Sequence, residues 1–170
     1  SMTVAIDTRA KELQALGQDI VALGAGEPDF DTPSHIKEAA IASLREGKTK
    51  YTAPTGIPEL KKAVSDKLSR ENGVNIPSTQ VVITSGVKHA VANVLQTLLN
   101  AGDEVVIPAP YWVTYPELVK LYGGTPVFIE TSVATGYKIT PQALEAAITP
   151  RTKAMILCNP SNPTGMVYGK

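Results

Sequence analysis

Short apolar runs alternate with amphipathic segments through the second half of the chain. The runs are rich in β-branched residues and bounded by turn residues, which predicts strands at 81–84, 105–108, 127–130 and 154–158. Between them, apolar residues recur at helical spacing, which predicts helices over 87–99, 114–122 and 141–148. Strands that alternate with helices are typical of a parallel sheet covered by helices on both faces. The sequence therefore predicts an α/β fold with a mainly parallel, helix-covered sheet.

The first half of the chain predicts three helices and one short strand. The first helix covers 3–16 and ends at Gly17. The second begins with Thr32 as N-cap and Pro33 as the first helical residue, and it closes near Gly47. The remaining elements are a strand at 20–23 and, after a loop at 48–57, a helix over 58–72 that Gly73 ends. No repeat, linker or shift in composition marks a domain boundary.

Composition excludes several classes of function. Hydrophobic residues make up 43% and charged residues 19%, which fits a globular protein. Lys plus Arg and Asp plus Glu are 16 each, so no global field favours nucleic acid or an anionic membrane. No apolar run approaches a membrane span, and His35 and His89 lack partners at metal-binding spacing. A single cysteine and no secretion signal lead us to expect a cytoplasmic protein without a metal site.

Four loop segments lie where strands and helices are predicted to join. They are 24–33 (GAGEPDFDTP), 84–90 (TSGVKHA), 108–116 (PAPYWVTYP) and 159–165 (NPSNPTG). In open α/β sheets, ligands bind outside the carboxyl ends of the strands. We therefore expect these loops to be parts of one pocket.

The loop at 84–90 has the form of a phosphate-binding turn. A strand leading directly into a helix leaves the N–H groups of Gly86, Val87 and Lys88 exposed at the positive end of the helix. The alternative is an ordinary turn in which Ser85 caps the helix, and the short motif alone favours it. Lys88 fits either an anionic substrate or a solvated position at the helix start.

The other loops carry side chains suited to a planar ligand. Two Asn-Pro pairs make the loop at 159–165 rigid enough to aim an asparagine amide, although such a loop can also be a plain turn. Trp112 is usually expected in a core, but here it can form a wall of a ring-binding slot. Gly26 allows close approach of the backbone to a ligand, while Asp29 and Asp31 are interpreted as turn and cap residues. Cys158 is interpreted as an apolar filler that ends a buried strand.

Taken in order, these motifs resemble the fold-type I pyridoxal-phosphate aminotransferases, in particular the bacterial aspartate aminotransferase branch. The segments that carry the resemblance are VALGAGEPDFDTPSHIKEAA, GKTKYTAPTGIPELKKAV, ITSGVKHAV, GDEVVIPAPYWVTYPE and ITPRTKAMILCNPSNPTGMVY. The resemblance implies that 1–35 contributes to a small domain and to the substrate-site loop. It also implies that 36–170 is the first part of the cofactor-binding large domain.

The resemblance also implies a role for each motif residue. Backbone N–H groups of Gly86, Val87 and Lys88 would hold the phosphate of the cofactor, pyridoxal phosphate. Trp112 would stack on its pyridine ring. Asn162 would donate a hydrogen bond to the phenolic oxygen of the ring. Tyr51 would contact the phosphate in the partner subunit of a homodimer. The backbone N–H of Gly26 would bind the substrate carboxylate.

The same resemblance implies an enzyme that moves an amino group between aspartate and 2-oxoglutarate. In that family the Schiff-base lysine, the aspartate at the pyridine nitrogen and the carboxylate-binding arginine follow the NPTG motif. We therefore expect an N-terminal fragment that contains none of the catalytic residues and is inactive alone. Prephenate, aromatic or alanine transamination and carbon–sulfur lyase chemistry remain open, as does a non-catalytic cofactor-binding module.

Overall fold

The computed structural model describes residues 2–24 and 26–169. The chain forms two compact units, Ser1–Tyr51 and Thr52–Lys170. The boundary expected after residue 35 concerns the domains of the complete family fold and stays a prediction. Among the described residues, no helix combines the length and the apolar character needed to cross a bilayer.

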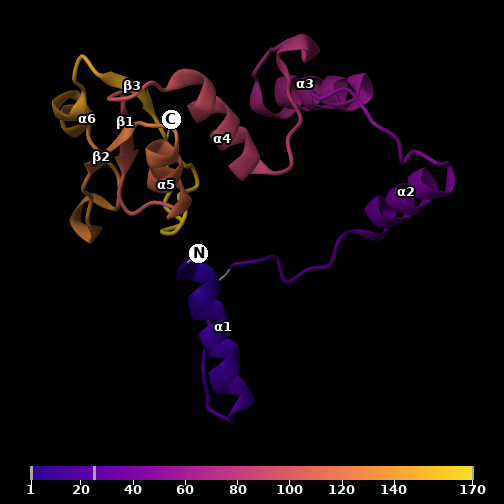
Figure 1. The fold of residues 1–170 in the computed structure, drawn as a ribbon, viewed down its shortest axis with the longest axis horizontal. Helices are drawn as coiled ribbons and strands as arrows, with labels where there is room; N and C mark the ends of the chain where they lie inside the picture. Colours follow the sequence, from indigo (N-terminus) through magenta and orange to yellow (C-terminus); the bar gives the residue numbers. More distant parts are fainter. Residues whose placement is uncertain (1, 25, 170) are drawn as a thin grey trace. The chain divides into compact units, whose positions relative to one another are not determined.

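The first unit contains helices α1 (Met2–Ala15) and α2 (Ser34–Arg45) (Figure 1). The strand predicted at 20–23 is wrong, because this segment pairs with no other strand. It runs back along α1 instead: the Gln14 amide donates to the carbonyl of Ile20 over 2.9 Å, and Gly24 lies against Ile6. The segment is therefore extended without the hydrogen-bonded neighbour that a strand requires, and Val21 and Leu23 remain exposed.

Helix α2 begins one residue later than the sequence predicts. Pro33 is the N-cap and has an extended conformation, with φ −52° and ψ 139°, so Ser34 is the first helical residue. The expected side-chain cap at Thr32 is therefore wrong. The neighbouring Asp31 accepts the Thr32 N–H at 2.8 Å and pairs with Lys37 at 2.6 Å, which fixes the entry to the helix.

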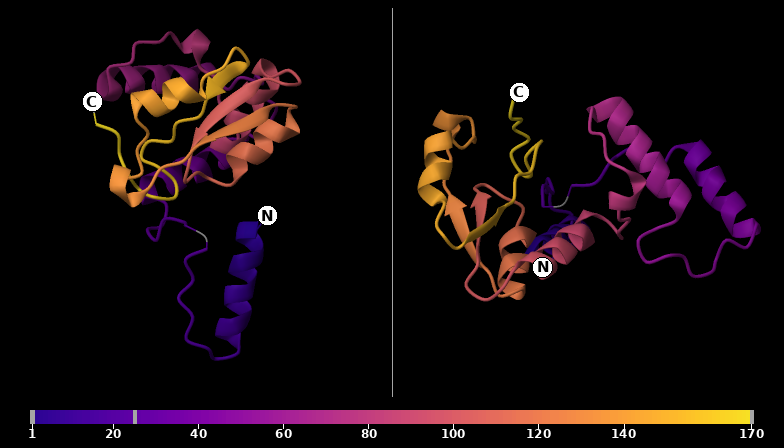
Figure 2. Two further views of the ribbon diagram at one scale, coloured as in Figure 1. Left: turned by 90° about the vertical axis from the view of Figure 1, so that its left-hand side faces the viewer. Right: turned by 90° about the horizontal axis from the view of Figure 1, so that it is seen from above.

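The second unit is a three-stranded parallel sheet with helices on both faces. Its elements are α3 (Pro58–Asn72), η1 (Ser78–Gln80), α4 (Val87–Leu98), β1 (Glu104–Pro108), α5 (Thr114–Leu121), β2 (Thr125–Ile129), η2 (Val133–Thr135), α6 (Pro141–Ala147) and β3 (Thr152–Met155). The strand order is β2-β1-β3. Figure 2 shows α4 and α5 on one face of the sheet and α6 on the other. This confirms the predicted α/β class.

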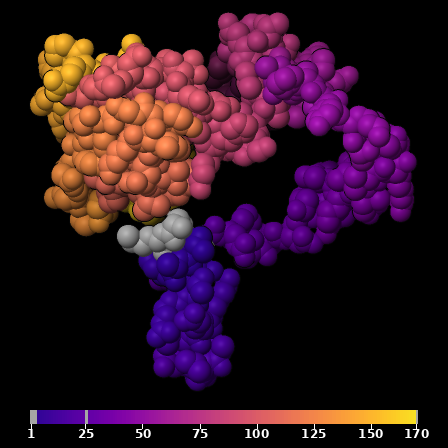
Figure 3. Space-filling model, viewed as in Figure 1, coloured from indigo at the N-terminus to yellow at the C-terminus, as the bar shows by residue number. Residues whose placement is uncertain are grey.

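Strand β1 is the centre of this unit. It pairs with β2 along its whole length, from Glu104 opposite Thr125 to Pro108 opposite Ile129, and with β3 on its other edge. Val105 and Val106 are completely buried on opposite faces. The larger core lies on the side of α4 and α5 and comprises Leu95, Leu99, Val105, Ile107, Tyr115 and Val119. Figure 3 shows the orange and yellow segments around the sheet packed into a continuous body.

Two further strand predictions need correction. The strand predicted at 81–84 does not form, because this extended segment has no strand beside it among the described residues. Its backbone bond from Ile83 N–H to Thr55 O, 3.0 Å long, goes to a loop. The last strand occupies Thr152–Met155, whereas 154–158 was predicted. Its pairing with β1 begins with Thr152 opposite Glu104, and these polar residues precede the apolar run on which the prediction was based.

Glu104 joins β1 to the start of β3 at the amino-terminal edge of the sheet. Its buried carboxylate accepts a hydrogen bond from the Thr149 hydroxyl at 2.6 Å and two from the Arg151 guanidinium at 2.8 and 2.6 Å. The Thr149 hydrogen bond, followed by those from Arg151, lowers the pKa of Glu104 below its ordinary value of 4.5. These contacts bridge the register shift between Glu104 and Val105 in the β1–β3 pair.

We expect Glu104→Gln to reduce stability at neutral pH and to flatten the loss of stability in acid. Because the pKa of Glu104 is lower in the folded state, the ionised carboxylate stabilises the folded protein. This contribution is complete above pH 4.5, the ordinary value, and it is lost as the pH falls through the lower folded-state pKa. Thermal unfolding midpoints measured from neutral pH to below pH 4.5 should converge for wild type and variant. Glu117→Gln removes an exposed carboxylate that pairs with Lys120 and is the control. A Glu104 variant with the same acid slope as wild type would contradict this account.

Candidate functional site

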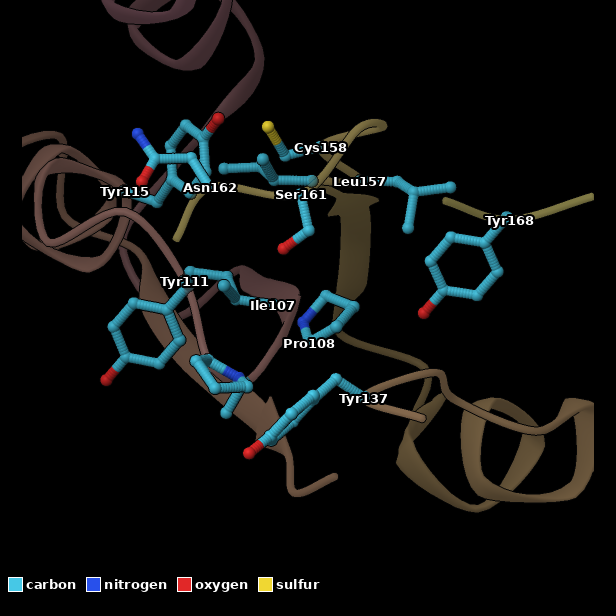
Figure 4. A pocket seen from close by; sticks show the side chains of 13 residues that line it. Ile107, Pro108, Tyr111, Tyr115, Tyr137, Leu157, Cys158, Ser161, Asn162 and Tyr168 are labelled. Carbon is cyan, nitrogen blue, oxygen red and sulfur yellow. The ribbon is translucent and has the colours of Figure 1, made fainter. Parts of the chain in front are cut away.

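The carboxyl ends of β1 and β3 open into one cleft, called the strand-end cleft below. Its lining includes Tyr111, Tyr115, Cys158, Ser161, Asn162 and Tyr168 (Figure 4). Tyr111 and Tyr115 belong to the loop segment at 108–116 and Ser161 and Asn162 to the one at 159–165, both of which the sequence singles out, while Cys158 and Tyr168 flank the second segment. The parallel sheet brings them together because both loops leave its same edge.

The two asparagines of the Asn-Pro loop, residues 159–165, have different environments. The Asn159 Oδ1 accepts the backbone N–H of Tyr168 at 3.0 Å, so this side chain holds the loop closed. The loop backbone is itself paired, with Ser161 N–H donating to Met166 O and Gly165 N–H donating to Ser161 O at 2.9 and 2.8 Å. The Asn162 amide, by contrast, lies on the cleft and has no hydrogen-bond partner within the described residues. It is the amide of this loop that is available to a ligand.

Trp112 is held against the core at the start of α5. Its ring is half-buried and meets the ring of Tyr115 edge-to-face, with centroids 5.4 Å apart and planes at 90°. Tyr115 is itself 8% exposed and belongs to the core of the sheet. Trp112 is therefore braced by the core, and its predicted role as a wall for a planar ligand stays a prediction.

The start of α4 offers backbone amides beside this wall. Gly86 is the N-cap with φ 81°, a conformation that favours glycine, and no side chain caps the helix. The alternative that Ser85 caps it is therefore wrong, and the Ser85 N–H donates to His89 Nδ1 at 3.2 Å. The Gly86 N–H is also engaged, by Thr84 O at 2.9 Å. The backbone amides of Val87, Lys88 and His89, in the first turn, have no intrahelical acceptor, since the first such bond runs from Ala90 N–H to Gly86 O.

Lys88 connects the α4 start to the indole. Its Nζ lies 5.2 Å from the centroid of the Trp112 ring. Among the described residues it forms no salt bridge. An ammonium held at an aromatic ring and left without a carboxylate partner can bind an anionic group. Lys88 is nevertheless exposed, so the alternatives of an anionic substrate and a solvated position both stay predictions.

Tyr51 and Gly26 belong to the first unit, so their roles stay predictions. Tyr51 is fully exposed at the end of that unit. A Cβ added to Gly26 would meet no atom within 4 Å, which leaves its backbone open to approach. Neither residue has a hydrogen bond to another described residue.

The pair Tyr115 and Cys158 is a part of the site that the sequence did not predict. Cys158 lies beyond the end of β3, which corrects its predicted place at the end of a strand, and it packs against the core cluster, as a filler would, while it also lines the cleft. Its thiol donates to Pro160 O at 3.3 Å. Burial, and then the neighbouring Cys158 thiol, raises the pKa of Tyr115 to about 12, so this hydroxyl stays protonated. The position of Tyr115, three residues after Trp112 at the start of a helix, is the signal that could have identified it.

The arrangement suits a flat, phosphorylated ligand. It combines open backbone amides at the start of α4, an indole wall and an unpaired side-chain amide on the cleft. Within the described ranges, no three His, Cys, Asp or Glu residues are grouped to hold a metal.

The chain is similar to known proteins in both sequence and fold. Residues 18–170 match the family model for aminotransferases of class I and II. An aspartate/prephenate aminotransferase of Cereibacter sphaeroides is 55% identical over 99% of this chain and 42% of its own length. The aspartate aminotransferase of Thermus thermophilus, solved with maleate, superposes with a TM-score of 0.96 at 50% identity, over 100% of this chain and 44% of that one. An alanine aminotransferase from Pyrococcus furiosus has a TM-score of 0.93 at 37% identity, over 99% of this chain and 44% of its own. The chain thus spans less than half the length of these relatives.

Proposed function

Because the chain belongs to the class I and II aminotransferase family, we propose that it forms part of an enzyme that transfers the amino group of aspartate to 2-oxoglutarate with pyridoxal phosphate. The observation that carries the proposal is the unpaired Asn162 amide, which lies on the strand-end cleft from a loop that Asn159 and backbone hydrogen bonds hold closed. The Asn162 side chain is exposed, so its amide is open to a ligand that displaces water. The names of the relatives support aspartate as the amino donor.

The residues present fit this cofactor. The Val87 and Lys88 N–H groups would donate to its phosphate, at the positive end of α4. The Trp112 indole would lie against its ring and fix the plane of that ring. The Asn162 amide would donate to its phenolic oxygen. When bound, pyridoxal phosphate supplies an electron sink for the bonds at the α-carbon of the substrate.

The chain's own contribution is to bind and orient. A fixed indole keeps the ring plane constant, so a substrate bond can be held perpendicular to that plane. Gly26 would offer its N–H to the α-carboxylate of the substrate, and Lys88 is the cation nearest the indole for a second carboxylate. Tyr51 would reach the phosphate in the partner subunit of a homodimer.

The identity of the amino acid is the open part of this function. One relative is named for both aspartate and prephenate, and another for alanine. Rates measured with aspartate, alanine and an aromatic amino acid, each against 2-oxoglutarate, test the proposal directly. Faster turnover of alanine than of aspartate would contradict it, and no turnover of any amino acid by the complete protein would favour the non-catalytic module.

We expect Asn162→Ala to weaken binding of pyridoxal phosphate by about tenfold and to shift its absorbance, without lowering the thermal midpoint of the cofactor-free protein. A lost hydrogen bond to a charged oxygen costs about 1.5–3 kcal/mol, and Asn162 contributes no bond to the fold. Asn159→Ala is the matched contrast, because Asn159 braces the loop against Tyr168. That variant should lower the thermal midpoint as well. Equal effects of the two substitutions on cofactor and stability would contradict the roles assigned here.

We expect Lys88→Met to raise KM for aspartate and 2-oxoglutarate by about tenfold or more while leaving KM for alanine and pyruvate within about twofold. The substitution keeps the approximate length and apolar stem of the side chain and removes the ammonium that lies 5.2 Å from the indole centroid, and bonds to charged groups contribute about 1.5–3 kcal/mol. Lys120→Met, on α5 and paired with Glu117, is the control. Equal changes for dicarboxylic and monocarboxylic substrates would remove this role of Lys88.

We expect the complete protein to be a homodimer in which Tyr51 contributes to the site of the partner subunit. The support is that Tyr51 is exposed and has no partner among the described residues of its own chain. Light scattering should report the dimer mass, and Tyr51→Phe should weaken cofactor affinity by several-fold, as expected for a lost phosphate hydrogen bond. A fully active monomer, or unchanged affinity in the variant, would refute this assignment.

A further inference from the structure

Tyr115 contacts both loops that form the strand-end cleft. Its ring meets Trp112, from the loop after β1, at 5.4 Å and 90°. Its hydroxyl lies beside the thiol of Cys158, which in turn donates to Pro160 O within the Asn-Pro loop after β3 at 3.3 Å. Figure 4 shows Tyr115 and Cys158 at the same end of the cleft. One side chain therefore spans from the indole wall to the loop that carries Asn162.

Tyr115 is itself immobilised by the core. It is 8% exposed and packs in the cluster of Leu95, Leu99, Val105, Ile107 and Val119. Side chains in such clusters are close-packed and occupy single rotamers. Trp112 is less buried and lies at the margin of this cluster. The orientation of the indole therefore depends on the residue that braces it.

The edge-to-face contact restricts rotation of the indole. A ring held perpendicular to its neighbour cannot turn about its own bonds without losing the contact or overlapping the fixed ring. The hydroxyl contact with Cys158 adds a second restraint, because it fixes where the Tyr115 ring lies relative to the Asn-Pro loop.

We propose that Tyr115 is a positioning residue that sets the plane of the Trp112 indole and its distance from the Asn-Pro loop. This inference rests on the proposed function, since it assigns to Tyr115 the geometry of the slot in which the cofactor ring binds. The ring of Tyr115 fixes the indole, and its hydroxyl fixes the loop. Tyr115 touches neither the reacting atoms nor the phosphate seat in this assignment.

The chain provides a matched control for a purely structural role. Tyr122 follows α5 and packs against the same core cluster, but no ring contact joins it to Trp112 among the described residues. Tyr115→Leu and Tyr122→Leu each remove one aromatic ring from this cluster. Both substitutions are expected to lower the thermal midpoint. A difference between the two variants in circular dichroism or in cofactor affinity therefore reports on positioning of the indole.

The first measurement needs no cofactor. Near-ultraviolet circular dichroism of the cofactor-free complete protein contains a Trp112 contribution, which is defined as the band lost in Trp112→Phe. This band should collapse in Tyr115→Leu, persist in Tyr115→Phe and persist in Tyr122→Leu. Persistence of the band in Tyr115→Leu would overturn the proposal, whatever the protein binds.

The second measurement uses pyridoxal phosphate itself. Its visible circular dichroism arises from the fixed, asymmetric surroundings of its ring, so this signal reports orientation. Tyr115→Leu should reduce the signal per bound cofactor and weaken affinity by about tenfold, as the upper end of aromatic pair energies implies. Tyr115→Phe should keep most of the signal, with affinity within about threefold of wild type, because the ring contact remains. Tyr122→Leu should match wild type in both.

The outcomes separate this proposal from the proposed function. A wild-type protein that binds no pyridoxal phosphate would refute the function, while the cofactor-free spectra would still decide whether Tyr115 orients Trp112. A wild type that binds the cofactor, with Tyr115→Leu and Tyr122→Leu alike in signal and affinity, would refute the positioning role alone.

Discussion

The complete burial of β1 is the constraint on which the second unit depends. A strand that is paired on both edges and covered on both faces must be apolar, and Val105, Val106 and Ile107 meet that requirement. Burial of each such side chain contributes about 1.5–3 kcal/mol, and a slip of one residue would exchange the faces of all three. The strand's register is therefore strongly specified. The loops at its carboxyl end take their positions from that register.

The cleft shows how a rigid scaffold leaves selected groups available. The Asn-Pro loop uses Asn159 and its own backbone to close itself, and Cys158 bonds to the same loop. The Asn162 amide is left over at the cleft. The α4 start follows the same logic, since Ser85 and Gly86 bond locally and the next two amides do not. A polar group that forms no hydrogen bond within the protein remains available to bind a ligand.

The sequence predicted the elements whose signals are local. Helix α3 has the predicted bounds, because Pro58 and Gly73 define its ends through their own backbone preferences. The strands at 20–23 and 81–84 were wrong, because a strand exists only beside a partner and a sequence pattern does not name one. The same limit applies to the site. Trp112 and Asn162 were predicted from loop motifs, and their roles stay predictions, whereas the link through Tyr115 and Cys158 joins residues far apart in sequence and needed the folded structure.

In the proposed function, uncharged groups contact the cofactor and a charged group contacts the substrate. The groups assigned to the cofactor are backbone amides, an indole and a side-chain amide, all neutral and all fixed by the fold. The charge is concentrated in Lys88, whose flexible stem places the ammonium at the indole. Neutral groups on fixed backbone set geometry, and a movable charge sets which anion is attracted. Cofactor orientation can therefore stay constant while one side chain changes the preferred substrate, which is consistent with relatives of this fold that are named for aspartate, prephenate and alanine.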